Sequence, residues 1–97
     1  MVSGVAPHNP MGPVATAVNV HFAAATHNFR ILEYVDPTQS EFGKWVDEPY
    51  LPKDGYLELR DRPGLGLDVD EEAVSGNEYV HWQRTAPVRP DGATGYI

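Results

Sequence analysis

Two side chains in the sequence, His8 and Glu33, have types and positions that could carry out acid–base chemistry. His8 lies between Pro7 and Pro10, and these prolines restrict the backbone, so His8 is expected on a rigid turn. An imidazole can act as a general base near neutral pH. A carboxylic acid in a water-excluded pocket can stay protonated and donate a hydrogen bond to developing negative charge. The pair could therefore remove a proton and stabilise the charge that results.

The elements around this pair predict how it is positioned. Residues 3–6 form a short, partly apolar segment, residues 13–26 repeat apolar side chains at helical spacing, and residues 29–35 are typical of a strand. This order predicts a βαβ unit, the repeat of a parallel sheet or barrel. Parallel strands end on the same face, so the side chains of His8 and Glu33 are expected to converge. Spacing alone nevertheless favours a plain structural interpretation, with His8 as a turn residue and Glu33 as an ordinary strand-end acid.

Charge is distributed very unevenly along the chain. Residues 1–29 contain no Asp, Glu, Lys or Arg, whereas all 14 acids lie between Glu33 and Asp91. The helix predicted over residues 13–26 is apolar or small nearly all round, which is typical of a helix buried on most sides. A chain terminus normally lies in water, so this segment is expected either to be a buried central element of something larger or to bind a partner. The chain is therefore interpreted as one end of a protein separated from its context.

Composition excludes several classes of protein. The chain has 97 residues, which is one domain at most, and its net charge of -7 argues against a nucleic-acid surface. It has no cysteine, which excludes a disulfide framework, a thiolate zinc site and a Cys nucleophile. No apolar run approaches the roughly 20 residues of a membrane span, and no Lys or Arg precedes Arg30, so no secretory leader is expected. The chain is expected to be soluble and cytoplasmic.

The other histidines have ordinary interpretations. His21 and His27 are expected to serve helix packing and the helix end, and His81 is expected at the surface. Four scattered histidines without cysteine partners give weak support for a metal site.

The second half of the chain is expected to be mostly irregular. Its patterns predict an exposed strand over residues 56–59 and a short helix over residues 70–76. Tyr79 and Trp82 are expected to anchor the tail.

Several motifs in order resemble those of a known family. They are Ala-Pro-His-Asn-Pro-Met-Gly-Pro at residues 6–13, the Ala-rich helix, Asn28-Phe29 leading to Leu32-Glu33-Tyr34, and the runs at residues 49–56 and 62–66. Over about residues 3–83 they resemble the mandelate racemase subgroup of the enolase superfamily. The nearest similarity is to its sugar-acid dehydratases, such as the galactonate, gluconate and xylonate dehydratases.

The resemblance implies an α/β fold, here the C-terminal fragment of a (β/α)8-type barrel whose tail returns to an α+β capping domain. The chain would begin at the end of barrel strand seven, residues 13–26 would be helix seven, and residues 29–33 would be strand eight. Residues 1–48 would then belong to the barrel domain. Residues 49–97 would be an extension that packs on the barrel and the capping domain.

The resemblance also implies a chemistry. Family members remove the proton alpha to a carboxylate, which gives an enediolate held by Mg²⁺, and then expel the beta-hydroxyl as water. His8 matches the usual base, Glu33 matches the residue that hydrogen-bonds the enediolate oxygen, and Trp45 lies where some dehydratases contact the sugar chain. The metal ligands and the second acid/base residue would lie outside this sequence. His27 stands where the family pattern would have proline, a departure that concerns packing more than chemistry.

Three functions stay open at this point. The first is a Mg²⁺-dependent sugar-acid dehydratase, a homo-oligomer acting on a small-molecule sugar acid, with this chain as its C-terminal part and inactive alone. The second is a racemase or epimerase of the same subgroup, which would use the same two residues without elimination. The third is a non-catalytic, truncated gene product.

Overall fold

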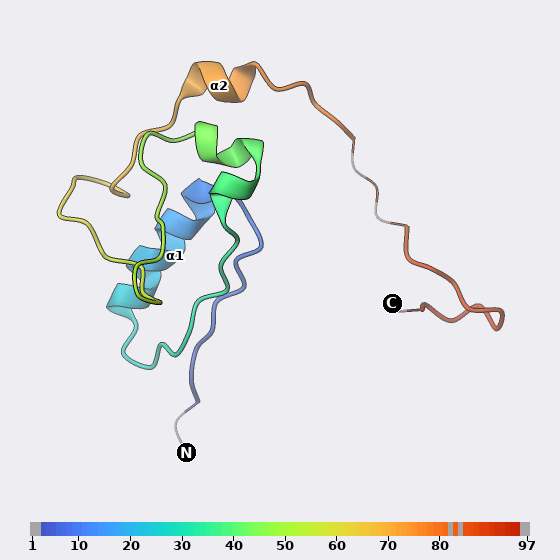
Figure 1. Ribbon diagram of the computed structural model, residues 1–97. Coiled ribbons are helices and arrows are strands. Elements are labelled where there is room, and N and C mark those ends of the chain that lie inside the picture. Colours follow the sequence, from blue (N-terminus) through green and yellow to red (C-terminus); the bar gives the residue numbers. More distant parts are fainter. Residues whose placement is uncertain (1–2, 82, 84, 96–97) are drawn as a thin grey trace.

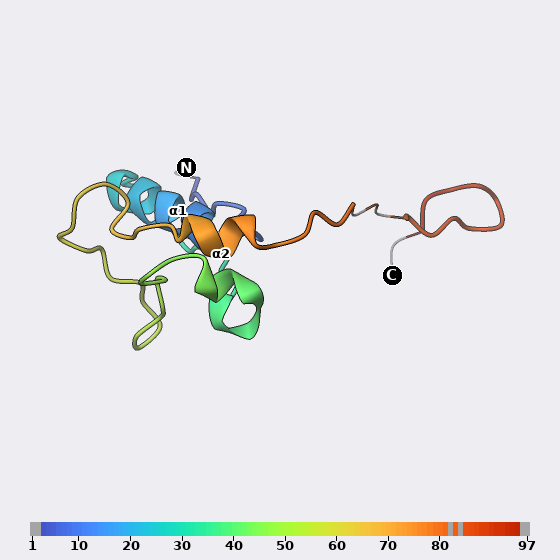
Figure 2. The ribbon, with the colours of Figure 1, turned by 90° about the horizontal axis from the view of Figure 1, so that it is seen from above.

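The computed structural model describes residues 3–81, 83 and 85–95. A folded part surrounds one long helix, and the chain after the second helix runs away from it (Figures 1 and 2). The elements are the α-helices α1 (Pro13–Ala25) and α2 (Glu71–Ser75) and the 3₁₀ helices η1 (Pro37–Gln39) and η2 (Glu41–Lys44). Among the described residues, no helix is long and apolar enough to cross a membrane.

Helix α1 matches the helix predicted over residues 13–26. Proline at its first position suits a helix start, because that N–H would be unpaired in any case. The helix ends at Ala25 and is capped by Thr26, whose hydroxyl donates to the carbonyl of Phe22 at 2.7 Å. The buried residues of α1 recur at spacings of three and four and therefore lie on one face. They are Pro13, Thr16, Ala17 and Val20. Burial on most sides was predicted; within this chain the remaining faces are largely exposed, with Phe22 at 48%.

The two predicted strands are reduced to a single parallel bridge between Val5 and Phe29. Val5 donates to the carbonyl of Asn28 and accepts from the amide of Arg30, both at 2.9 Å. The next donor on that side of a parallel ladder would be residue 7, which is a proline without an N–H. The ladder therefore stops after this bridge. Within the part of the chain that the structure describes, no strand extends beyond a single bridge.

Two features of the second half were predicted in part. The turn at residues 53–56 is present, with Asp54 and Gly55 both at positive φ (52° and 83°), but the strand expected over residues 56–59 is only the bridge that closes this turn. Helix α2 matches the predicted short helix, and Asp70 caps it by accepting from the amide of Ala73.

The tail anchors were not confirmed. Tyr79 is 85% exposed, so it does not hold the tail to the folded part. Trp82 lies outside the described residues.

The core is built where Tyr50 meets α1. Its ring is 2% exposed and packs with Ala17 and Val20. The Tyr50 hydroxyl donates to the carbonyl of Leu65 at 2.8 Å, and the Arg60 guanidinium lies 4.1 Å above the ring. Arg60 also donates to the main-chain carbonyls of residues 48, 49 and 66. These bonds fix the irregular segment 47–68 internally without a sheet, and the packing of Tyr50 places the segment against α1.

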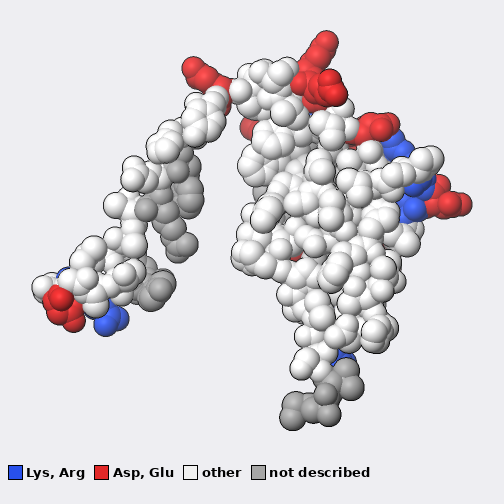
Figure 3. Space-filling model, turned by 180° about the vertical axis from the view of Figure 1, so that it is seen from behind, with Lys and Arg blue, Asp and Glu red and all other residues white. Residues whose placement is uncertain are grey.

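The charged side chains lie at the rim of this core. Arg62 bonds the carboxylates of Asp47 and Asp68 at 2.8 and 2.7 Å. Figure 3 shows the charges gathered along the edges of the folded part, with the visible face between them almost free of charge.

We expect Gly66→Ala to lower the free energy of unfolding more than Gly64→Ala. Both glycines have positive φ, 77° and 65°, so alanine strains the backbone at each by about 1–2 kcal/mol. Only at Gly66 would the added Cβ lie 2.6 Å from the Tyr50 hydroxyl. Displacing that hydroxyl from Leu65 adds the cost of an unmade hydrogen bond, about 1–3 kcal/mol. Urea unfolding measures both variants, and equal losses would contradict this packing of Tyr50.

We expect Arg62 to keep the pKa of Asp47 low and so to stabilise the fold at acidic pH. The Arg62 hydrogen bond, followed by that of the Asp68 amide, lowers the pKa of Asp47 from 3.8 to about 2. Because the folded pKa is lowered, this stabilisation is fully present above 3.8 and is lost as the pH falls through about 2. In carbon-13 NMR titrations, Arg62→Gln should return the pKa of Asp47 toward 3.8. Lys44→Gln, which removes an exposed pair with Glu41, is the control. An unchanged Asp47 pKa in Arg62→Gln would contradict the assignment.

Candidate functional site

The structure brings His8 and Glu33 together. His8 Nδ1 lies 2.8 Å from Glu33 Oε2, although the two residues are 25 positions apart in the sequence. The Val5–Phe29 bridge sets this meeting, because it aligns the segments that carry the two residues in parallel. The side chains are 77% and 46% exposed. The convergence expected from the order of elements is therefore observed, at a position open to water.

A buried asparagine supports this pair. Asn9 is 0% exposed, and its backbone N–H donates to Glu33 Oε2 at 2.7 Å. Its Nδ2 donates to the main-chain carbonyl of Glu33 and to Thr16 Oγ1, both at 3.0 Å. Its Oδ1 accepts from Asn19 Nδ2 at 3.1 Å. One side chain thus ties the His8 turn, helix α1 and the Glu33 segment together.

Sequence reasoning missed Asn9, Thr16 and Asn19. A signal was available, because a polar residue in a segment expected to be buried needs hydrogen-bond partners. Thr16 and Asn19 are three residues apart and therefore share a face of α1. Nothing in the spacing, however, says that this face meets residue 9.

Tyr34 fixes the chain directly after Glu33. Its hydroxyl donates to the main-chain carbonyl of Tyr50 at 2.8 Å. Burial, with the negative charge of Asp36 as a second cause, raises the pKa of Tyr34 above 10.0. The Tyr34 hydroxyl therefore stays a hydrogen-bond donor at neutral pH, and it links the site to the Tyr50 core.

Trp45, the third candidate, does not meet the pair. It follows η2, is half-buried, and its ring packs against Phe42 with 4.5 Å between the centroids. Within the described residues no hydrogen bond or ring contact joins it to His8 or Glu33.

The remaining histidines have structural surroundings. His21 is half-buried, with Nδ1 2.9 Å from the carbonyl of Ala17, and His27 is exposed. His81 is exposed beside Tyr79. In the part of the chain that the structure describes, no group of three His, Cys, Asp or Glu side chains could hold a metal ion.

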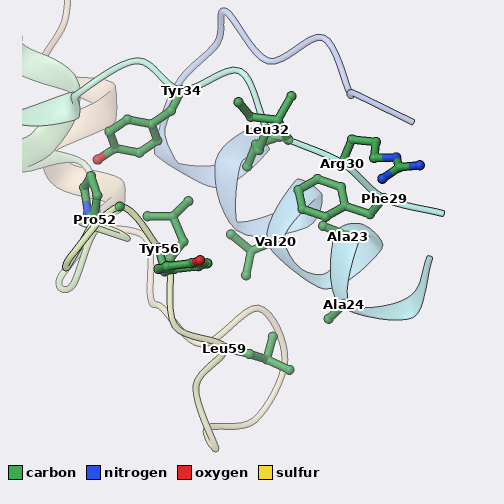
Figure 4. Close-up of a pocket in the computed structure, with 13 residues that line it drawn as sticks. Val20, Ala23, Ala24, Phe29, Arg30, Leu32, Tyr34, Pro52, Tyr56 and Leu59 are labelled. Atoms are coloured by element: carbon green, nitrogen blue, oxygen red, sulfur yellow. The ribbon is translucent and has the colours of Figure 1, made fainter. Parts of the chain in front are cut away.

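A cavity of about 390 Å³ lies elsewhere, between α1, residues 29–34 and the turn near Tyr56 (Figure 4). Its walls are mainly apolar, with Val20, Phe29 and Leu32 among them, and neither His8 nor Glu33 lines it. The acid–base pair is thus separate from this cavity.

Known proteins resemble this chain in sequence and in structure. The family model described as enolase C-terminal domain-like matches residues 3–73. A D-galactonate dehydratase family member of Enterococcus gallinarum is 34% identical over 94 residues, which are 91% of this chain and 23% of that protein. The D-xylonate dehydratase of Haloferax volcanii is 37% identical over 76 residues, or 75% of this chain and 18% of that protein. The chain thus spans about a fifth of the length of these relatives.

Solved structures agree. An enolase of Agrobacterium radiobacter, provisionally described as a galactarate dehydratase and solved with bound Na and L-malate, is 57% identical with a TM-score of 0.84. That match covers 94% of this chain and 27% of that one. A protein of Burkholderia SAR-1, provisionally described as a mandelate racemase/muconate lactonizing enzyme, is 31% identical with a TM-score of 0.72, over 96% and 25% of the two chains. The resemblance seen in the motifs is confirmed: the chain belongs to the family of enolase C-terminal domain-like proteins, with the α/β fold of that domain.

Proposed function

We propose that this chain supplies the base and the enediolate-binding acid of a Mg²⁺-dependent sugar-acid dehydratase formed by a larger protein. The observation that carries the proposal is the 2.8 Å contact between His8 Nδ1 and Glu33 Oε2. Relatives named as dehydratases of D-xylonate and D-mannonate, and as members of the D-galactonate dehydratase family, support the same reaction.

His8 is the proposed base. Its Nδ1 faces Glu33, so Nε2 is the nitrogen available to accept a proton from a substrate. The side chain is 77% exposed, so a small acid can reach it. Neutral imidazole would remove the proton alpha to the substrate carboxylate, and the C–H electron pair would move into that carboxylate as an enediolate. The enediolate pair would then form a C–C double bond while the beta-hydroxyl takes up a proton from the second acid/base residue, proposed to lie outside this chain, and leaves as water.

Glu33 is the proposed partner of the enediolate oxygen. The contacts that the described residues make with its carboxyl group go to Oε2, from His8 and from the Asn9 amide. Oε1 is therefore the oxygen that can face a substrate. As a protonated acid, Glu33 would donate a hydrogen bond to the oxygen on which negative charge develops.

The described residues do not form a Mg²⁺ site, because no three metal-ligating side chains lie together. No step above is routed through a metal, and the proposal assigns the Mg²⁺ ligands to residues outside this chain. The L-malate bound by the Agrobacterium enolase is a hydroxycarboxylate, as sugar acids are, which supports a small hydroxy acid as the substrate class.

The rest of the proposal concerns the larger protein. Residues 1–48 would belong to its barrel, with α1 as helix seven, and residues 49–97 would be the extension toward a capping domain. Trp45, whose ring packs at a tilt against that of Phe42, would contact the sugar chain. The assembled protein would be a cytoplasmic homo-oligomer.

A racemase or epimerase is the second candidate, favoured by solved neighbours provisionally described as mandelate racemase/muconate lactonizing enzymes. It would use the same pair without losing water. A keto acid product identifies the dehydratase, whereas a stereoisomer of the substrate identifies the racemase.

We expect the 97-residue chain by itself to dehydrate none of D-galactonate, D-xylonate, D-mannonate and galactarate, with or without Mg²⁺. The reason is that its described residues bring no set of metal ligands together, so the metal's share of the charge stabilisation that an enediolate requires would be missing. Proton NMR of each reaction detects loss of substrate. Turnover by the purified chain would contradict the proposal that further residues are needed.

A chimera tests the role of His8. This chain replaces the segment of the Agrobacterium enolase that it matches at 57% identity. We expect His8→Asn in the chimera to lose about 10²–10⁴-fold in turnover, because asparagine keeps hydrogen bonding but cannot accept the proton. Exchange of the alpha proton in D₂O should fall in parallel.

His27→Asn, the same change at an exposed histidine, is the matched control and should keep the parent rate. A His8→Asn variant that turns over at near-parent rates would leave His8 as a turn residue. A folded chimera without activity on any sugar acid would favour the non-catalytic alternative.

A further inference from the structure

We propose that Asn9 is the positioning residue of the site, which holds the carboxyl group of Glu33 in register with His8. The proposal rests on the function proposed above for His8 and Glu33. Asn9 would not touch the substrate; it would act through Glu33.

The first argument is burial. Asn9 is the largest side chain of the described chain that is fully buried, at 0% exposure, next to a histidine that is 77% exposed. A buried amide is costly unless its donors and acceptor are all paired. Here they are, since no buried side-chain polar atom among the described residues lacks a partner. Such a network is rigid, because shifting any member leaves a buried group unpaired.

The second argument is that Asn9 grips Glu33 at two points. Its N–H donates to carboxyl Oε2 at 2.7 Å, and its Nδ2 donates to the main-chain carbonyl at 3.0 Å. Both the backbone and the carboxyl end of Glu33 are therefore held by the residue that follows His8. Because Asn9 follows His8 directly and also bonds Glu33, it would set the distance between the proposed base and the proposed acid. Misplacement by about 1 Å can cost 10²-fold in rate.

The third argument is that asparagine has the required set of groups. Its two Nδ2 hydrogens serve Thr16 Oγ1 and the Glu33 carbonyl, and its Oδ1 accepts from Asn19. Aspartate has the same shape but no donor, so it would lose two bonds and bring a second carboxyl group beside Glu33. Asn9→Asp is therefore the sharpest change, since it alters chemistry and not volume.

The kinetic test uses the chimera with D-galactonate, D-xylonate, D-mannonate and galactarate. We expect Asn9→Asp to lower kcat by about 10–100-fold and to change KM by less than about threefold, because Glu33 acts on the enediolate and not on the bound substrate. Rates are taken per folded protein, measured by circular dichroism. Asn28→Asp is the matched control, since the hydrogen bond of Asn28 Nδ2 within the described residues goes to the carbonyl of Ser3, and it should keep the parent kcat.

A double-mutant cycle separates positioning from folding. If Asn9 acts through Glu33, Asn9→Asp should change kcat by less than about threefold in a Glu33→Gln background. The full loss in that background would overturn the proposal, because it would mean that Asn9 supports the fold alone. Should Asn9→Asp not fold, Thr16→Val removes one partner of Nδ2 and should lower kcat by about 3–10-fold. Thr16→Ser keeps the hydroxyl and should restore the parent rate.

A measurement that needs no activity tells failure of this proposal from failure of the proposed function. In the 97-residue chain, the Asn9 amide should be protected from hydrogen exchange, and Glu33→Ala should speed its exchange by at least about tenfold. An Asn9 amide that exchanges equally fast in both chains overturns the positioning role, whatever the kinetics. A protected amide together with a folded, inactive chimera instead overturns the proposed function.

Discussion

The Asn9 side chain has no access to water, so each of its donors and acceptors must bond within the chain. Those bonds reach Thr16 and Asn19 on α1 and the main chain of Glu33. They join three segments that have almost no sheet pairing, since a single bridge connects residues 5 and 29. In most βαβ units a ladder of hydrogen bonds does this work. Here Pro7 ends the ladder, and the buried side chain of Asn9 joins the three segments instead.

Tyr50 is a second residue that joins several segments, and it connects the rest of the folded part to the site. Tyr50 accepts from Tyr34, donates to Leu65 and lies under the Arg60 guanidinium. Tyr34 directly follows Glu33, so the chain at Glu33 is held by Asn9 on one side and by Tyr50 on the other. An irregular segment can be well positioned in this way, because its carbonyls are bonded by side chains rather than by neighbouring strands.

The chemistry of the site follows from what is buried and what is open. The His8 and Glu33 side chains are 77% and 46% exposed, whereas Asn9, the residue proposed to position Glu33, is fully buried. This chain by itself does not enclose the side chain of Glu33. Helix α1 likewise leaves Val18 and Phe22 about half exposed. Both observations support the proposal that a larger protein, of which this family domain is a part, completes the site.

Patterns in the sequence were enough to predict α1, α2, the turn at residues 53–56 and the convergence of His8 with Glu33. Each depends on neighbouring residues or on the order of elements, and the motifs also identified the family. Only the tertiary structure decided that the strands shrink to one bridge, that Tyr79 lies in solvent and that Asn9 rather than a ladder holds the site. The physical reason is that a hydrogen bond between residues 9 and 33 depends on which faces meet in space. The spacing of residues along the chain does not show which faces come into contact.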